Sequence, residues 1–376
     1  MKRELERIDV PGEHEARERA WRVVAAAFAG RKPVPRPSHW PRVAAVAIAA
    51  SAIIAATLSP PGRAVLDEIR EAVGVERAQP ALFSLPAAGR LLVTSDAGVW
   101  VVTQDGSKRL LGDYREATWS PFGRFVAAVD ENELVALEPD GDIRWTLPRP
   151  AVSSPRWGGT QTDTRIAYID RTGLRIVAGD GTGDRLLAPG FRGQLAWRPG
   201  SGLVLAYVTT KEIRVRDVES GRTLWRAVRR PAAVPTGLSW SSDGRQLLVL
   251  SPRALRVYDA RGRVVDRNDP AEGWPNVDAS FRPNTPQVAV ARVHGSQSTV
   301  FGLTGSRFDN FNGTGEFRQI EWSPSGRWLL ITWPTADQWV FMRARRDARR
   351  IRGIANISEQ FRSRSFPRIE GWCCAP

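Results

Sequence analysis

Residue types that could support chemistry are few and scattered in this chain. The densest acidic loop, Asp180-Gly181-Thr182-Gly183-Asp184, could hold a cation but offers too few ligands for an EF-hand loop. Cys373 and Cys374 are adjacent, which fits neither a CxxC motif nor a disulfide framework. The three histidines lie far apart and match no metal-ligand spacing: His14, His39 and His294. We therefore expect no metal, no cofactor and no catalytic residue, a turn at the acidic loop, and two free or buried thiols.

A short motif that begins with an aromatic residue recurs about every 40 residues, and this repeat predicts the architecture. It is clearest at Trp119-Ser120-Pro121-Phe122-Gly123-Arg124 and returns at Trp240 and Trp322. In the unit that begins near Leu195, a short strand, a Gly/Pro turn, two apolar strands and a Gly hairpin follow one another. Four antiparallel strands per repeat predict the blade of a β-propeller, so the fold class is all-β. The aromatic residues that head the repeats, with one more near the C-terminus, are Phe83, Trp119, Trp157, Trp197, Trp240, Phe281, Trp322 and Trp372.

These repeat aromatics have a structural interpretation. A blade must bury both faces against its neighbours, and a large flat side chain near the inner strand fills the gap. A platform that stacks on carbohydrate is the functional alternative. Four tryptophans fall outside the repeat phase and are better candidates for surface or pore use: Trp100, Trp328, Trp333 and Trp339.

The C-terminal segment predicts how the ring closes. Phe366 to Trp372 echoes Phe317 to Trp322, so it reads as an opening strand with no unit after it. We expect it beside Leu91 to Thr94 in the first blade, because closure from both chain ends removes exposed sheet edges. Residues 82–376 should form a propeller of seven four-stranded blades, or of six or eight if Phe83 or the last strand is counted differently.

A single membrane span is expected at residues 43–61, within 20 uncharged residues between Arg42 and Arg63. A buried soluble helix and a cleaved signal peptide are the alternatives. Basic residues without acids precede the span, whereas acids accompany the basic residues after it, which predicts a cytoplasmic N-terminus. The propeller would then be extracytoplasmic, joined by a stalk helix and linker at residues 62–81, the helix running from Arg63 to Val75.

Residues 1–42 are expected to be a cytoplasmic amphipathic helix followed by a Pro-rich linker. The helix carries an apolar stripe that includes Trp21, Val24 and Phe28. A lone helix has no core for this stripe to cover, so it should lie on a lipid surface, self-associate or dock on a protein partner, with a frayed helix as the remaining alternative. Trp21, Val24 and Phe28 are the candidate partner face.

The formal net charge is +14, from 54 Lys and Arg against 40 Asp and Glu. The arginines are spread over every repeat rather than clustered in one stretch. We interpret them as a solvated surface, with a polyanion-binding face as the alternative, and we do not expect a nucleic-acid partner.

The Trp-Ser-Pro-x-Gly-Arg openings and endings such as Val257-Tyr258-Asp259 resemble WD40-like and TolB-type β-propellers over about Leu82 to Trp372. No Gly-His opens a unit and no Trp-Asp closes one, so the WD40 hydrogen-bond tetrad is not implied. The layout, with its closing Gly371-Trp372-Cys373-Cys374, is similar to uncharacterised single-pass propeller proteins of high-GC actinobacteria. The resemblance implies the fold and the membrane anchor, and it supplies no active site.

Three functions are compatible with these features. The leading one is a membrane-tethered extracytoplasmic propeller that binds a protein or an envelope ligand without catalysis, as a sensor or scaffold. A transmembrane regulator of anti-sigma type would couple that binding to the cytoplasmic helix. An extracytoplasmic hydrolase or lyase is the third, because a ring can unite distant residues at its pore. Carboxylates with shifted pKa values at the pore would favour the enzyme, whereas Arg, Ser and apolar groups would count against it.

Overall fold

The structure is a computed structural model that describes residues 75–76, 84–200, 202–209, 211–228, 234–303, 310–344 and 351–374. Among these residues, no helix is long and apolar enough to cross a bilayer. The expected cytoplasmic helix with Trp21, Val24 and Phe28, and the expected span at 43–61, lie outside the described residues.

The described chain is all-β and forms seven blades, each with four antiparallel strands that run from an inner to an outer strand. The inner strands are β29 Arg368–Cys373, β5 Glu116–Trp119, β9 Ser153–Gly159, β13 Leu195–Trp197, β17 Gly237–Trp240, β21 Asn276–Phe281 and β25 Ile320–Trp322. The second strands are β2 Arg90–Ser95, β6 Val126–Val129, β10 Thr164–Ile169, β14 Val204–Val208, β18 Gln246–Ser251, β22 Val288–His294 and β26 Trp328–Trp333. The third strands are β3 Gly98–Val102, β7 Glu133–Leu137, β11 Gly173–Ala178, β15 Glu212–Asp217, β19 Ala254–Asp259, β23 Gln297–Gly302 and β27 Gln338–Arg343. The outer strands are β4 Lys108–Gly112, β8 Ile143–Pro148, β12 Arg185–Pro189, β16 Thr223–Val228, β20 Val264–Asn268, β24 Phe311–Thr314 and β28 Ile351–Ala355.

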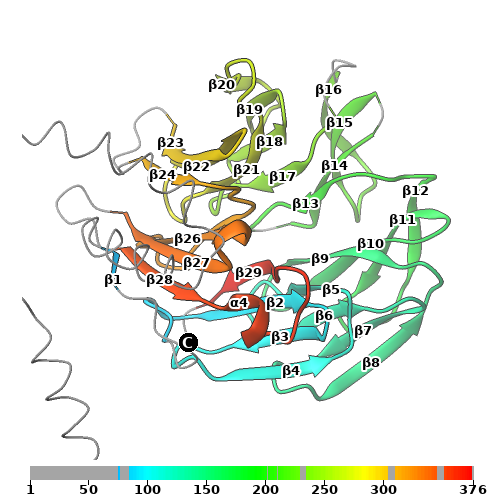
Figure 1. Ribbon diagram of the computed structural model, residues 1–376. Helices are drawn as coiled ribbons and strands as arrows, with labels where there is room; N and C mark the ends of the chain where they lie inside the picture. The colour runs from blue at the N-terminus through cyan, green and yellow to red at the C-terminus, as the bar shows by residue number, and fades with distance from the viewer. Residues whose placement is uncertain are drawn as a thin grey trace, which may run out of the picture. The chain divides into compact units, whose positions relative to one another are not determined.

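The sheets form a closed ring. Inner strands touch in the order β29, β5, β9, β13, β17, β21 and β25, and β25 touches β29 again. The expected seven-bladed β-propeller is therefore confirmed (Figure 1). Two short helices, η1 Pro334–Ala336 and α4 Ile357–Gln360, lie in connections that flank β27 and β29.

The ring is closed by a strand from the far end of the chain. Strand β29 pairs antiparallel with β2, with Trp372 opposite Leu91 and Ile369 opposite Val93. This confirms the expected place of the C-terminal strand in the first blade, where it takes the inner position. Phe83, the other candidate to open that blade, lies outside the described residues.

The chain leading into the propeller adds a strand to the last blade. Strand β1, Val75–Glu76, pairs in parallel with β28, with Val75 opposite Ile351. Val75 was expected to end the stalk helix, and it lies in a strand instead. The outer edge of β28 offers unpaired backbone groups, and β1 satisfies some of them. The rest of the stalk helix falls outside the described residues.

The Trp-Ser phrase recurs because its serine shapes the first turn of a blade. The Ser120 hydroxyl accepts the backbone N–H of Phe125 at 2.9 Å. Ser241 does the same for Gln246 at 3.0 Å, and Ser323 for Trp328 at 3.1 Å. The glycine three residues after each serine has φ of 63–65°, a left-handed conformation that favours glycine. The turn therefore needs both a short hydroxyl side chain and a glycine at fixed spacing.

The repeat aromatics lie between blades. Trp119, Trp157, Trp240, Phe281, Trp322 and Trp372 are buried and Trp197 is partly buried. The indole N–H of Trp197 donates to the carbonyl of Arg156 on the preceding inner strand at 2.8 Å. Trp240 and Trp322 donate in the same way to the carbonyls of Ala196 and Ser280, each at 3.3 Å. Each of these three indoles thus joins two blades by packing and by a hydrogen bond.

Three of the four tryptophans outside the repeat phase are core residues, contrary to the sequence-based expectation of surface or pore use. Trp100, Trp328 and Trp339 are buried in one cluster between the last and first blades, together with Phe361 and Trp372. Trp333 packs at the edge of a neighbouring cluster. The junction where the ring closes is wide enough to need several large side chains, so tryptophans appear there without a repeat period.

Arginines connect neighbouring blades by hydrogen bonds to the same Trp-Ser turns. Arg282 donates from Nε to the carbonyl of Gly326 at 2.7 Å and lies 5.4 Å from the ring centre of Trp322. Arg198 makes the equivalent bond to Gly244 at 2.6 Å, over Trp240. Burial lowers the pKa of Arg282 from its ordinary value, which marks a guanidinium drawn out of water. A hydrogen bond from a cation and a cation–π contact therefore stabilise each of these junctions.

We predict that Arg282→Met destabilises the propeller by about 2 kcal/mol, because it keeps the aliphatic stem and removes the charged hydrogen bond to Gly326. Urea unfolding followed by tryptophan fluorescence measures this change. Arg261→Met, at an exposed hairpin position, is the matched control and should leave the midpoint unchanged. Equal midpoints for Arg282→Met and the unmodified chain would contradict a stabilising contact of Arg282 between blades.

Candidate functional site

The inner strands line a central channel, and their polar side chains brace one blade to the next. An inner strand has an unpaired edge whose N–H groups face the channel, and such groups need acceptors. Glu116 accepts the backbone N–H of Ser154, on the next inner strand, at 2.7 Å. Asp278 accepts that of Ile320 at 2.9 Å. The channel carboxylates thus contribute to holding the ring together.

Gln319 makes the corresponding brace at the closing strand. Its side-chain oxygen accepts the N–H of Ile369 at 2.9 Å, and its side-chain nitrogen donates to the carbonyl of Ile369 at 3.0 Å. Gln319 of the last blade therefore forms hydrogen bonds with both the N–H and the carbonyl of Ile369 in β29. This paired contact fixes the closing strand in register.

Two channel carboxyls have raised pKa values. Burial raises the pKa of Glu321 to about 8, and the nearby carboxylate of Asp278 raises it further, against a backbone hydrogen bond from Trp372. Burial also raises the pKa of Asp278 to about 6, although two backbone N–H groups oppose that change. At neutral pH Glu321 is therefore largely protonated inside the channel.

Arg368 and Glu370 form a pair on the closing strand. Arg368 Nε donates to Glu370 Oε1 at 2.7 Å, and the same oxygen accepts the hydroxyl of Thr94 at 2.9 Å. Arg368 also donates to the backbone carbonyl of Arg115 at 3.1 Å. Its guanidinium is thereby held between the first and second blades, with about half of the side chain exposed.

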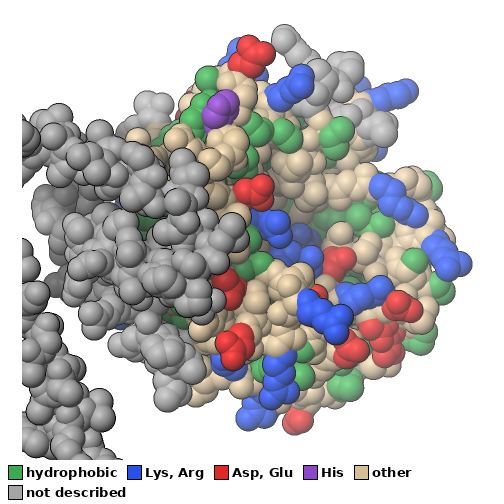
Figure 2. All heavy atoms as spheres, in the orientation of Figure 1, with side chains coloured by type: hydrophobic (Ala, Val, Ile, Leu, Met, Phe, Trp, Pro, Cys, Tyr) green, Lys and Arg blue, Asp and Glu red, His purple; other side chains and the backbone are tan. Residues whose placement is uncertain are grey.

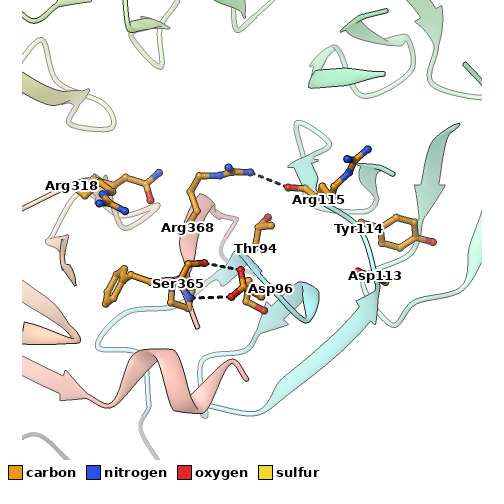
Figure 3. Close-up of a pocket in the computed structure, with 12 residues that line it drawn as sticks. Thr94, Asp96, Asp113, Tyr114, Arg115, Arg318, Ser365 and Arg368 are labelled. Atoms are coloured by element: carbon orange, nitrogen blue, oxygen red, sulfur yellow. Dashed lines mark hydrogen bonds between the residues drawn. The ribbon is translucent and has the colours of Figure 1, made fainter. Parts of the chain in front are cut away.

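At one end the channel opens into a hollow of about 540 Å³, which we call the channel mouth (Figure 3). Its wall includes Thr94, Asp96, Tyr114, Arg318 and Arg368. Gln319 and Arg368 also line the channel below, so the mouth and the channel are continuous. The mouth has the size of sites that hold small molecules or single side chains of a larger ligand.

One wall of the channel mouth is the loop that leads into β29. Asp96, in the turn between β2 and β3, accepts the backbone N–H groups of Arg364 and Ser365 at 2.7 and 3.0 Å. It also accepts the hydroxyl of Ser365 at 2.7 Å. The bonds from Ser365 and Arg364 lower the pKa of Asp96 to about 2. Asp96 is therefore a charged clamp for this loop, and its lone pairs are largely occupied.

Three arginines from consecutive blades meet at the channel mouth, from the segments that enter β25, β29 and β5. They are Arg318, Arg368 and Arg115, which Figure 3 shows in a row above Ser365 and Asp96. Figure 2 shows Lys and Arg side chains gathered around a hollow near the middle of the face drawn. Arg115 pairs with Glu131 at 3.3 Å, but both side chains are more than half exposed, so this pair stabilises little.

The acidic loop singled out in the sequence is a structural turn. Asp180 accepts the N–H and hydroxyl of Thr182. Asp184 is nearly buried, and its carboxylate accepts hydrogen bonds from Arg149, Arg175 and Tyr168. Burial would raise the pKa of Asp184, but those hydrogen bonds outweigh it and hold the pKa below its usual range. The carboxylate of Asp184 is therefore occupied by its own partners, and Asp180 shapes the turn.

The remaining sequence candidates also have structural partners. Within the described ranges, no group of three His, Cys, Asp or Glu residues could hold a metal ion. His294 stacks on Trp274 and bonds to the carbonyl of Gly273 at 2.7 Å. Cys373 and Cys374, expected as thiols, are joined as a disulfide, with Cys374 in a left-handed conformation directly after β29. The disulfide packs against Gly123 of the second blade. A Cβ atom at that position would lie only 3.0–3.2 Å from the two sulfur atoms.

Sequence reasoning singled out none of the channel residues, although a signal was present. Side chains alternate along a strand, so the residue before each repeat aromatic faces the opposite way. Four channel-lining residues hold that position before Trp119, Trp157, Trp240 and Trp322, namely Thr118, Arg156, Ser239 and Glu321. The arginines of the channel mouth come from the loops before β25 and β5 and the start of β29, and two of them, Arg318 and Arg368, lie in the segments that echo each other in the sequence.

Comparison with known proteins adds little. No protein-family model matches the chain, and no curated protein matches it. A solved chain of Kuenenia stuttgartiensis hydrazine synthase is 13% identical, with a TM-score of 0.48, covering 61% of this chain and 76% of that one. A solved chain of the mitotic checkpoint complex is 17% identical, with a TM-score of 0.49, covering 63% and 76%. Neither likeness bears on what this chain binds or catalyses.

We predict that Glu321→Gln flattens the pH dependence of stability. The folded chain holds the Glu321 proton more tightly than the unfolded chain, whose pKa is near 4.5. The stability due to protonated Glu321 is therefore complete below about pH 4.5 and is lost as the pH rises to about 8. Glutamine stays neutral, so the variant should lose less stability between about pH 6 and pH 8.

The measurement is urea unfolding of the unmodified chain and of Glu321→Gln across that pH range. Glu316→Gln, at an exposed position in the same blade, is the control and should follow the unmodified chain. The same slope of unfolding free energy against pH in Glu321→Gln and in the unmodified chain would show that Glu321 does not carry a raised pKa.

Proposed function

We propose that this chain is a membrane-tethered, extracytoplasmic β-propeller that binds a protein or an envelope ligand without catalysis. The observation that supports this most is the channel mouth, a polar hollow built by loops of the last, first and second blades. Loops on a rigid scaffold are the usual place for recognition. We propose the channel mouth as the recognition site.

The membrane tether is supported by sequence alone. Residues 43–61 are uncharged and long enough to span a bilayer, and the basic residues before them favour a cytoplasmic N-terminus. The proposed kinship with TolB-type propellers and with single-pass propeller proteins of high-GC actinobacteria fits this layout. In a version of anti-sigma type, ligand binding outside would alter what Trp21, Val24 and Phe28 hold inside.

A hydrolase or lyase is the second candidate, favoured by the raised pKa values of Glu321 and Asp278 in the channel. A carboxyl with a pKa near 8 could act as a general acid. The hydrogen bonds favour a binding role over catalysis, because the carboxylates of Asp278 and Glu116 already accept backbone N–H groups of the neighbouring blade. Arg156 and Ser239 line the same channel, and Arg and Ser are among the residue types that were expected from the sequence in a pore without catalysis.

Photocrosslinking in intact cells tests this proposal. A benzophenone amino acid replaces Phe366 at the channel mouth, and irradiation should join the full-length chain to one discrete partner in the membrane fraction. The same amino acid at Ile143, on the exposed outer strand β8, is the control and should give no such product.

Protease added to intact spheroplasts then tests the orientation. It should degrade the propeller together with the crosslinked partner while the membrane remains closed. A product formed equally from Phe366 and Ile143 would contradict recognition at the channel mouth. A propeller that resists protease until the membrane is opened would contradict the extracytoplasmic location.

A further inference from the structure

We propose that the ligand at the channel mouth is an acidic segment of a protein chain, bound by Arg318 and Arg368. This inference rests on the proposed function and adds the chemistry of the partner. It requires positive charge available at the mouth and a surface on which a chain can lie.

Arg318 supplies available positive charge. Its side chain is exposed on the loop that enters β25. Within the described part of the chain, no hydrogen-bond acceptor or acid pairs with its guanidinium. A guanidinium presents five donors in a fixed planar fork, which matches the two oxygens of a carboxylate. Arg318 is therefore free to take a carboxylate from outside.

Arg368 supplies a second, pre-oriented cation. Glu370 and the carbonyl of Arg115 hold its guanidinium in place, and half of the side chain remains exposed. The order that a ligand would otherwise have to impose is already present, which lowers the entropy cost of binding. Glu370 offsets part of the charge, so Arg368 orients an acidic ligand while Arg318 supplies the unbalanced charge.

The acids around the channel mouth do not cancel this charge. Asp96 has its carboxylate occupied by Arg364 and Ser365, so it repels a ligand less than a free carboxylate would. Glu131 binds Arg115 through an exposed pair that a ligand carboxylate could replace at little cost. Asp113 is exposed at the rim and would face the ligand.

Deeper in the channel, carboxyl groups lie beside guanidinium groups. Glu116, Glu321 and Glu370 line the next section below the mouth, together with Arg156 and Arg368. At the mouth, Arg318 carries positive charge without an acidic partner in the described part of the chain. This arrangement suits a chain that lies across the mouth, with apolar contact from Tyr114 and Phe366.

Fluorescence anisotropy of labelled hexaglutamate with the full-length chain in a non-ionic detergent tests the inference. Hexaglutamate should bind at low salt, and labelled hexaglutamine should not. Arg318→Gln should weaken hexaglutamate binding about tenfold, the loss of roughly one charge-assisted pair. Arg245→Gln is the matched control, since Arg245 is 83% exposed in a turn at the far end of an inner strand. It should change the affinity less than about twofold.

Equal weakening by Arg318→Gln and Arg245→Gln would overturn the inference, because binding would then follow net charge alone. Inorganic phosphate that displaces hexaglutamate at equal concentration would also overturn it, in favour of a small anion. Hexaglutamate that fails to bind, while the Phe366 crosslink still forms, would overturn the acidic partner and leave the recognition site standing. Absence of that crosslink would instead remove the proposed function.

Discussion

The structure depends on the pairing of β29 with β2, which joins the C-terminal strand to the first blade. Every blade buries both faces against a neighbour, so an open ring would expose two apolar faces and two strand edges. Several independent contacts hold the closing strand: the ladder with β2, the two bonds of Gln319 to Ile369, and Trp372 in the largest core cluster. The clamp of Asp96 on Ser365 sets the path into the strand.

The same inner strands provide the ring contacts and the channel wall. Alternation along each strand sends the aromatic residue between blades and the residue before it into the channel. Carboxylates such as Glu116 and Asp278 accept N–H groups across blade boundaries, so they cannot be removed without loosening the ring. We therefore propose recognition at the channel mouth, where the side chain of Arg318 has no bracing partner among the described residues.

The sequence predicted the fold well because its signals are local and repeated. The expected strands near Leu195 match β13 to β16, and Phe366 to Trp372 lies in the first blade as predicted. The site was not predictable to the same degree. Arg318 and Arg368 lie in the two segments that echo each other in the sequence, but they meet only because the ring brings distant blades together. The prediction for Trp339 was wrong because this residue packs in the core cluster where the last and first blades meet, outside the repeat pattern.

The most direct test of this account is thermal unfolding of a chain truncated after Pro367, which lacks β29, beside one truncated after Cys374. Without β29, β2 has no inner partner and the cluster around Trp339 loses Trp372. We predict that the shorter chain shows no cooperative transition, whereas the longer one unfolds like the full-length chain. A cooperative transition at an unchanged temperature in the chain without β29 would contradict ring closure as the basis of the fold.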